Sequence, residues 1–131
     1  IIDKVRKEHN KCEIAHVVGE VKGKTAVLID DIIDTGGSIC QAANVVKEFG
    51  AKEVVIGATH ALLSGEAVQK LDECAASKIM LLDSVPITKQ KMIKKMEIVS
   101  LGPLLAKVIN RIYKEESLGE LFTWEKERKI L

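Results

Sequence analysis

The chain has 131 residues, a length that suits one domain with a single hydrophobic core. Its 20 basic and 19 acidic residues leave a formal charge of +1, which gives no electrostatic reason to expect nucleic acid or an anionic membrane surface as a partner. One Trp, one Tyr and two Phe are its only aromatic residues, so we expect no base-stacking platform and an aliphatic core.

The cysteines indicate a reducing compartment. Cys12, Cys40 and Cys74 are odd in number, widely spaced and without a CxxC pair, so we interpret them as reduced thiols and expect neither a disulfide framework nor a zinc site. No stretch resembles a signal peptide or a membrane span, and we therefore expect a cytoplasmic protein. Because the chain begins at Ile1 and not at a methionine, we expect a fragment or a processed chain.

The N-terminal segment gives the weakest signal. Residues 1–13 are mostly polar and charged, and their composition alone favours a frayed, solvated terminus. The apolar residues of 14–18 then predict a strand, with turns marked by Gly19 and Gly23.

The most informative stretch is Val27–Ser38, with the sequence VLIDDIIDTGGS. Its apolar run lacks alternation, which predicts a strand buried on both faces of a parallel sheet. Ligands of such sheets bind beyond the carboxyl ends of the strands, where we expect Asp30 and Asp31 to stand.

A tight loop follows this strand. Gly36 and Gly37 permit unusual dihedral angles, so the loop can turn backbone N–H groups toward an anion. We expect Ser38 to cap a helix whose N-terminal end adds to the anion site. Two acids beside a phosphate cradle suit a sugar phosphate, although an ordinary strand–helix turn with an accidental acid pair has the same pattern.

The rest of the chain alternates between helical and strand patterns. This order predicts an α/β fold with a mostly parallel sheet flanked by helices. The expected elements are a helix from Ser38 to a C-terminal Gly50, a strand over 53–59, a helix over 66–74, a strand over 78–82, a turn or short helix over 89–95, a strand over 97–101 and a helix with Pro103 in its first turn.

The string DDIIDTGGS at 30–38 resembles the phosphoribosyl-diphosphate (PRPP) loop of the type I phosphoribosyltransferase family. The resemblance implies that family's fold. The motif alone does not separate enzymes that make PRPP from enzymes that use it.

Other segments are similar to the ribose-phosphate diphosphokinases (PRPP synthetases). They are Ile1–Arg6 with Asn10, Ala58–Gly65, Asp83–Ile87 and Leu104–Ile112. The resemblance covers about residues 1–122 and implies the second, C-terminal domain of a two-domain enzyme, with 123–131 as a tail that it does not explain. In the family the first domain, absent from this chain, supplies most ATP contacts, so we expect the isolated chain to be inactive.

The resemblance also implies roles for individual residues in a reaction that moves the diphosphoryl group of ATP to the 1-hydroxyl of ribose 5-phosphate, giving PRPP and AMP. Lys4 and Arg6 match the basic residues of the catalytic loop, and Arg6 is also expected to bind ribose 5-phosphate. Val5 stands where family members commonly have a second arginine. Ribose 5-phosphate would be held by the hydroxyl ligands Asp30 and Asp31 and by the 5′-phosphate loop of Asp34, Thr35, Gly36, Gly37 and Ser38.

The same resemblance implies ATP and ribose 5-phosphate as substrates. It implies that Mg²⁺ binds through the phosphates of these substrates, with no set of metal ligands in this chain. It also implies a homo-oligomer, either a hexamer or an assembly of dimers. His16 and His60 are interpreted as structural. Two alternatives stay open: a phosphoribosyltransferase that consumes PRPP, and a non-catalytic regulatory subunit of the same fold.

Overall fold

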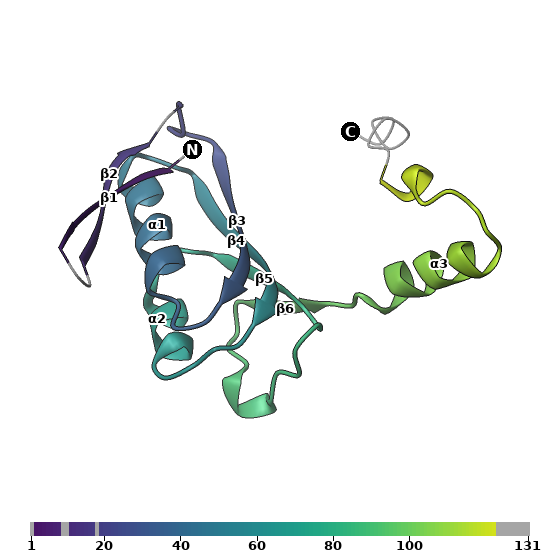
Figure 1. Ribbon diagram of the computed structural model, residues 1–131. Helices are drawn as coiled ribbons and strands as arrows, with labels where there is room; N and C mark the ends of the chain where they lie inside the picture. Colours follow the sequence, from purple (N-terminus) through teal and green to yellow (C-terminus); the bar gives the residue numbers. More distant parts are fainter. Residues whose placement is uncertain (1, 9–10, 18, 123–131) are drawn as a thin grey trace. The chain divides into compact units, whose positions relative to one another are not determined.

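The computed structural model describes residues 2–8, 11–17 and 19–122, and the side chains of 19–122 (Figure 1). The chain divides into two compact units, Ile1–Val99 and Ser100–Leu131. The predicted tail, 123–131, lies outside the described residues, so the boundary after residue 122 stays a prediction.

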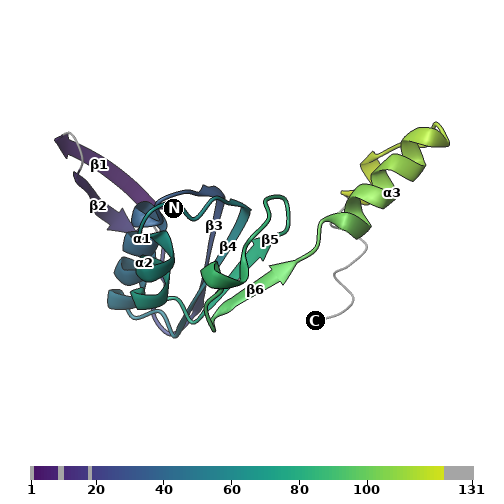
Figure 2. The same ribbon diagram turned by 90° about the horizontal axis from the view of Figure 1, so that it is seen from below.

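The first unit is built on a parallel sheet in which four strands follow one another in chain order. Both of its α-helices pack on the same face of this sheet (Figure 2). The predicted α/β fold is therefore confirmed. The elements are β3 (Thr25–Ile33), α1 (Gly37–Glu48), β4 (Glu53–Ala61), α2 (Ala67–Glu73), β5 (Lys78–Leu82), the 3₁₀-helix η1 (Lys89–Lys91) and β6 (Met96–Val99).

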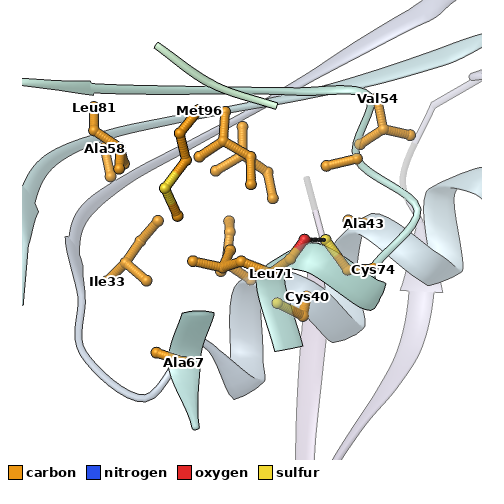
Figure 3. Packing of buried hydrophobic residues seen from close by; sticks show 14 of the residues in the cluster. Ile33, Cys40, Ala43, Val54, Ala58, Ala67, Leu71, Cys74, Leu81 and Met96 are labelled. Carbon is orange, nitrogen blue, oxygen red and sulfur yellow. Dashed lines mark hydrogen bonds between the residues drawn. The ribbon is translucent and has the colours of Figure 1, made fainter. Parts of the chain in front are cut away.

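Aliphatic side chains fill the space between the sheet and the two helices (Figure 3). Ile56, Ile79 and Leu81 of the sheet and Leu71 of α2 have essentially no exposed surface. Small residues such as Ala43 and Ala67 let the helices approach closely, which keeps this small core dense. The expectation of an aliphatic core is confirmed.

The prediction that the strand of the PRPP-loop motif is buried on both faces is wrong. Burial alternates over the first seven residues of β3: Val27 and Ile29 are 60% and 76% exposed, whereas Leu28 between them is half-buried. The reason is that α1 and α2 cover one face only, so every second side chain of β3 has no helix above it (Figure 2).

The frayed-terminus interpretation of residues 1–13 is also wrong for the described part. β1 (Ile2–Glu8) and β2 (Lys11–Val17) form an antiparallel pair, with Ile2 opposite Val17 and Arg6 opposite Cys12. Such a ribbon pairs the backbone groups that face the neighbouring strand and needs no continuous apolar run, so a highly charged composition does not prevent it. The strand expected at 14–18 is confirmed over its described residues, within β2.

The predicted C-terminal glycine of α1 is confirmed. Gly50 has φ 89°, and the N–H groups of Gly50 and Ala51 donate to the carbonyls of Lys47 and Val46 at 3.0 and 3.1 Å. This pair of bonds is the Schellman arrangement, which satisfies carbonyls that the helix leaves open.

The second unit contains α3 (Gly102–Tyr113), with Pro103 in its first turn as predicted, and the 3₁₀-helix η2 (Gly119–Leu121). Arg111 holds these two helices together, because its guanidinium donates to the Ser117 carbonyl and lies 2.7 Å from a Glu120 carboxylate oxygen. Among residues 2–8, 11–17 and 19–122, no helix combines the length and the apolar character needed to cross a bilayer.

Candidate phosphate and sugar site

A pocket of about 210 Å³ lies where β3 ends and α1 begins. It brings together six of the residues that the sequence predicts as ligands of ribose 5-phosphate. Its lining consists of Asp30, Ile32, Ile33, Asp34, Thr35, Gly36, Gly37, Ser38 and Ile39.

The backbone of the loop turns at Gly36. This residue has φ 74°, a left-handed conformation that residues with a Cβ rarely adopt, and its carbonyl accepts the N–H of Cys40 at 3.0 Å. Gly36 is thus the N-cap of α1, and the prediction that Ser38 caps the helix is wrong: Ser38 is already the second helical residue. The first N–H groups of a helix have no partner within it, and no side chain caps α1, so this end suits an anion.

The two adjacent acids do not share one site. β3 extends to Ile33, since its pairing with β4 continues through Ile33 and Ala61, so Asp30 and Asp31 lie within the strand and not beyond its end. Neighbouring strand residues project to opposite faces. Asp30 is half-buried and lines the pocket, whereas Asp31 is exposed and is absent from the lining. Asp31 Oδ1 instead accepts the N–H of Ile32 at 2.8 Å.

The segment after β4 supports the loop from behind. The N–H groups of Leu62 and Leu63 both donate to the Ile33 carbonyl, at 3.0 and 3.1 Å, and the N–H of Ser64 donates to the Asp34 carbonyl at 2.9 Å. Lys91 Nζ donates to the carbonyls of Leu62 and Leu63 at 3.0 and 2.9 Å. These bonds fix the carboxyl ends of the two strands against each other.

Two features of this support could not be read from the sequence. Leu63 has φ 52°, an unusual value for a side chain with a Cβ, and is 1% exposed, so tertiary packing imposes this conformation. Gly36 lies against the start of α2, where a Cβ on it would stand 3.5 Å from the Ala67 carbonyl oxygen. The family resemblance of Ala58–Gly65 was the only signal that pointed to this segment.

Lys4 and Arg6 lie on β1, opposite Ile14 and Cys12, and their side chains are outside the described part of the structure. Their predicted catalytic role stays a prediction. The side chain of His16 is likewise outside it. His60 has a structural partner, because its Nδ1 lies 2.9 Å from Ser84 Oγ.

The donor chemistry of the pocket is that of hard oxygen ligands. Asp30 and Asp34 are the carboxylates of its lining. Within the described ranges, no three His, Cys, Asp or Glu side chains gather as they would around a metal ion.

Comparison with known proteins gives one consistent result. The phosphoribosyl synthetase-associated domain family matches residues 4–123. The chain is 42% identical over 123 residues to a ribose-phosphate pyrophosphokinase of Caldanaerobacter subterraneus subsp. tengcongensis, and 43% identical over 123 residues to that of Bacillus subtilis. Each alignment covers 94% of this chain and 39% of the relative.

A solved structure agrees with the relatives. The crystal structure of phosphoribosylpyrophosphate synthetase from Mycobacterium smegmatis superposes with a TM-score of 0.70 at 46% identity, over 75% of this chain and 33% of that one. The chain therefore spans about two fifths of the length of these curated relatives, and it shares a fold with part of the Mycobacterium smegmatis enzyme.

Proposed function

Because the chain belongs to the phosphoribosyl synthetase-associated domain family, we propose that it is one domain of a ribose-phosphate diphosphokinase, the enzyme that its relatives' names describe as a pyrophosphokinase. The domain would be the C-terminal one and would supply the ribose 5-phosphate site. The remaining part of the enzyme would supply most contacts to ATP.

The observation that carries this proposal is the pocket at the junction of β3 and α1. A 5′-phosphate would accept hydrogen bonds from the open N–H groups of Gly37 and Ser38 and from the Thr35 hydroxyl, at the positive end of the α1 dipole. The ribose hydroxyls would donate to the carboxylate of Asp30 in the same pocket. The pocket thus offers hydrogen-bond donors for a phosphate at one end and a carboxylate for sugar hydroxyls at the other, which matches the two ends of a sugar phosphate.

The reaction needs positioning more than covalent chemistry. The 1-hydroxyl oxygen of ribose 5-phosphate attacks the β-phosphorus of ATP and forms a new O–P bond. The bond from the β-phosphorus to the oxygen shared with the α-phosphorus breaks, AMP leaves with that oxygen, and the hydroxyl proton passes to solvent. The transferring group is surrounded by negative oxygens, so fixed cations and a held sugar are the main protein contributions. Lys4 and Arg6 of β1 are proposed as those cations.

Magnesium is proposed as the accompanying ion, and its charge would offset that of the ATP phosphates when bound. Asp30 and Asp34 are the hard oxygen donors that the pocket could offer to it. Mg²⁺ commonly binds through one or two carboxylates together with substrate phosphates, which is compatible with this donor set. Assembly into a homo-oligomer and a cytoplasmic location stay predictions.

Binding of ribose 5-phosphate tests the site directly. Isothermal titration calorimetry of the purified chain should detect the sugar phosphate, and Asp30→Asn should weaken it by about ten- to a hundredfold, because an amide loses a charge-assisted bond of roughly 1.5–3 kcal/mol. Asp31→Asn is the matched control. Asp31 lies outside the pocket lining, so this substitution should reduce the affinity for ribose 5-phosphate several times less than Asp30→Asn does. Equal losses in both variants would contradict the pocket geometry.

Turnover separates this function from the alternatives. With the missing part of the enzyme restored, ribose 5-phosphate and ATP should give PRPP and AMP, and the chain alone should give none. PRPP consumption that depends on an added base would instead indicate a phosphoribosyltransferase. Binding without turnover in the restored enzyme would indicate a regulatory subunit.

A further inference from the structure

Cys40 and Cys74 form a buried thiol pair that the proposed reaction does not use. Cys40 is the fourth residue of α1 and is 7% exposed; Cys74 is the C-cap of α2 and is 6% exposed. Cys74 Sγ donates to the Leu71 carbonyl oxygen at 3.2 Å, and the Cys40 thiol is close enough to affect the pKa of Cys74. Figure 3 shows both residues on the helix side of the core, and both carry free thiols.

The backbone around Cys74 is held against α1 by a separate contact. The N–H of Ala75 donates to Asn44 Oδ1 at 2.8 Å. Asn44 is four residues after Cys40, so the two side chains are neighbours on one face of α1. The end of α2 is therefore docked on the part of α1 that carries Cys40, and this docking brings both cysteines to the lining of one cavity.

The pair is reachable although it is buried. Both cysteines line an open cavity of about 310 Å³, together with Gly37, Gln41, Asn44, Lys70 and Glu73. This cavity is distinct from the pocket of the candidate phosphate site, although Gly37 contributes to both. A small reagent entering the cavity would meet both sulfurs.

The charges around the pair favour a thiolate. Lys95 Nζ donates to the carbonyls of Cys74 and Ala76 at 2.8 and 3.1 Å, which fixes a cation beside Cys74. The neighbouring Cys40 thiol is the main cause that lowers the pKa of Cys74, and Lys95 acts in the same direction, whereas burial opposes them. The neighbouring Cys74 sulfur, together with burial, raises the pKa of Cys40, so Cys40 is the thiol that keeps its proton.

We propose that Cys40 and Cys74 are a redox-active dithiol that small-molecule disulfides oxidise to an intramolecular disulfide joining α1 to α2. An electropositive, partly accessible setting with an adjacent second thiol distinguishes a reactive cysteine from an inert buried one. The modification would stand one turn from the loop at Gly36, whose carbonyl accepts the N–H of Cys40.

The proposed oxidation is a thiol–disulfide exchange that needs no reagent other than the small-molecule disulfide. The Cys74 thiolate attacks one sulfur of the oxidant, forms a mixed disulfide and releases one thiolate. Cys40 then loses its proton, and its sulfur attacks the Cys74 sulfur and releases the second thiolate. The chain loses two protons and two electrons, and one disulfide of the oxidant becomes two thiols.

The test uses the chain with Cys12→Ser, so that only the proposed pair can react. The folded, reduced protein is incubated with oxidised glutathione at neutral pH, quenched with acid and weighed by intact mass spectrometry. We expect a loss of two hydrogens with no retained glutathione, and a proteolytic fragment that joins the peptides of Cys40 and Cys74. Two retained glutathiones would overturn the proposal.

Single-cysteine variants control for simple accessibility. Cys40→Ala and Cys74→Ala in the same background should each stop at a mixed disulfide with one glutathione, and the chain that keeps Cys74 should react faster. A parallel reaction in concentrated urea shows what the unfolded chain does. If the pair oxidises only in urea, the native cavity does not admit the oxidant and the proposal is wrong.

Discussion

The backbone N–H of Ser64 donates to the carbonyl of Asp34 over 2.9 Å, and this bond joins the segment after β4 to the loop after β3. The loop at the candidate phosphate site is therefore held by the neighbouring strand and not by its own residues alone. Lys91 holds the supporting segment in turn, through the carbonyls of Leu62 and Leu63. A loop fixed in this way can present its N–H groups to a phosphate with little loss of entropy on binding.

Gly36 should be the position of the loop that least tolerates a side chain. Its φ of 74° costs an L-residue roughly 1–2 kcal/mol, so Gly36→Ala should lower the free energy of unfolding by about that amount and weaken phosphate binding. Gly37→Ala is the matched control, since no atom lies within 4 Å of a Cβ built there. Urea unfolding followed by circular dichroism measures both, and equal stabilities would contradict the conformational argument.

The order of the elements was predictable from local patterns. The strand over 78–82 and the first-turn Pro103 of α3 were located correctly, and Gly50 was recognised as the end of α1. Each of these signals is local: an apolar run, a missing N–H or a residue free to adopt a positive φ. The motif at 30–38 likewise pointed to a loop that the structure forms.

The structural features that could not be predicted from the sequence depend on contacts between distant segments. The pairing of Ile33 with Ala61 extends β3 past both acids. Asp30 and Asp31 therefore project to opposite faces of the sheet, although the sequence suggested that they act together. The exposure of Ile29 depends on which face of the sheet the helices cover. The pairing of β1 with β2 was hidden because charged residues dominate both strands.

Burial should decide the cost of truncating two isoleucines on adjacent strands. Ile56 of β4 is 0% exposed, so Ile56→Ala should destabilise the chain by about 2–5 kcal/mol through lost burial and the cavity left behind. Ile29→Ala removes the same atoms from an exposed position on β3 and should cost less than about 1 kcal/mol. Urea midpoints of the two variants provide the comparison. Similar losses would mean that the exposed face of β3 is covered in solution.

The reactivity of Cys74 should depend on pH in a way that identifies its partner. The thiolate is the reactive form, and the neighbouring Cys40 thiol is the main cause that lowers the pKa of Cys74 to about 6. In the Cys12→Ser chain, alkylation of Cys74 by iodoacetamide should rise from acid pH and level off near neutrality. Cys40→Ala removes this thiol, so the pKa of Cys74 should rise and the midpoint of the alkylation curve should move to higher pH. An unchanged midpoint would show that Cys40 does not stabilise the thiolate.

The cations of β1 offer the sharpest test of the proposed catalytic role. If Lys4 and Arg6 contact the migrating diphosphoryl group, they act mainly where charge redistributes in the transition state. Replacing either with Ala should then cost roughly 3–4 kcal/mol, a fall on the order of a hundred- to a thousandfold in kcat, with a smaller change in KM.

Lys7 is the matched control for this experiment, because it is a cation on the same strand that the family resemblance does not assign to catalysis. Lys7→Ala should leave kcat within a few-fold of the parent enzyme. The measurement requires the restored two-domain enzyme, with PRPP formation followed at saturating ATP. If all three variants turn over at nearly the parent rate, β1 is a structural ribbon only. Retained ribose 5-phosphate binding in the same proteins would show that the pocket between β3 and α1 is independent of that result.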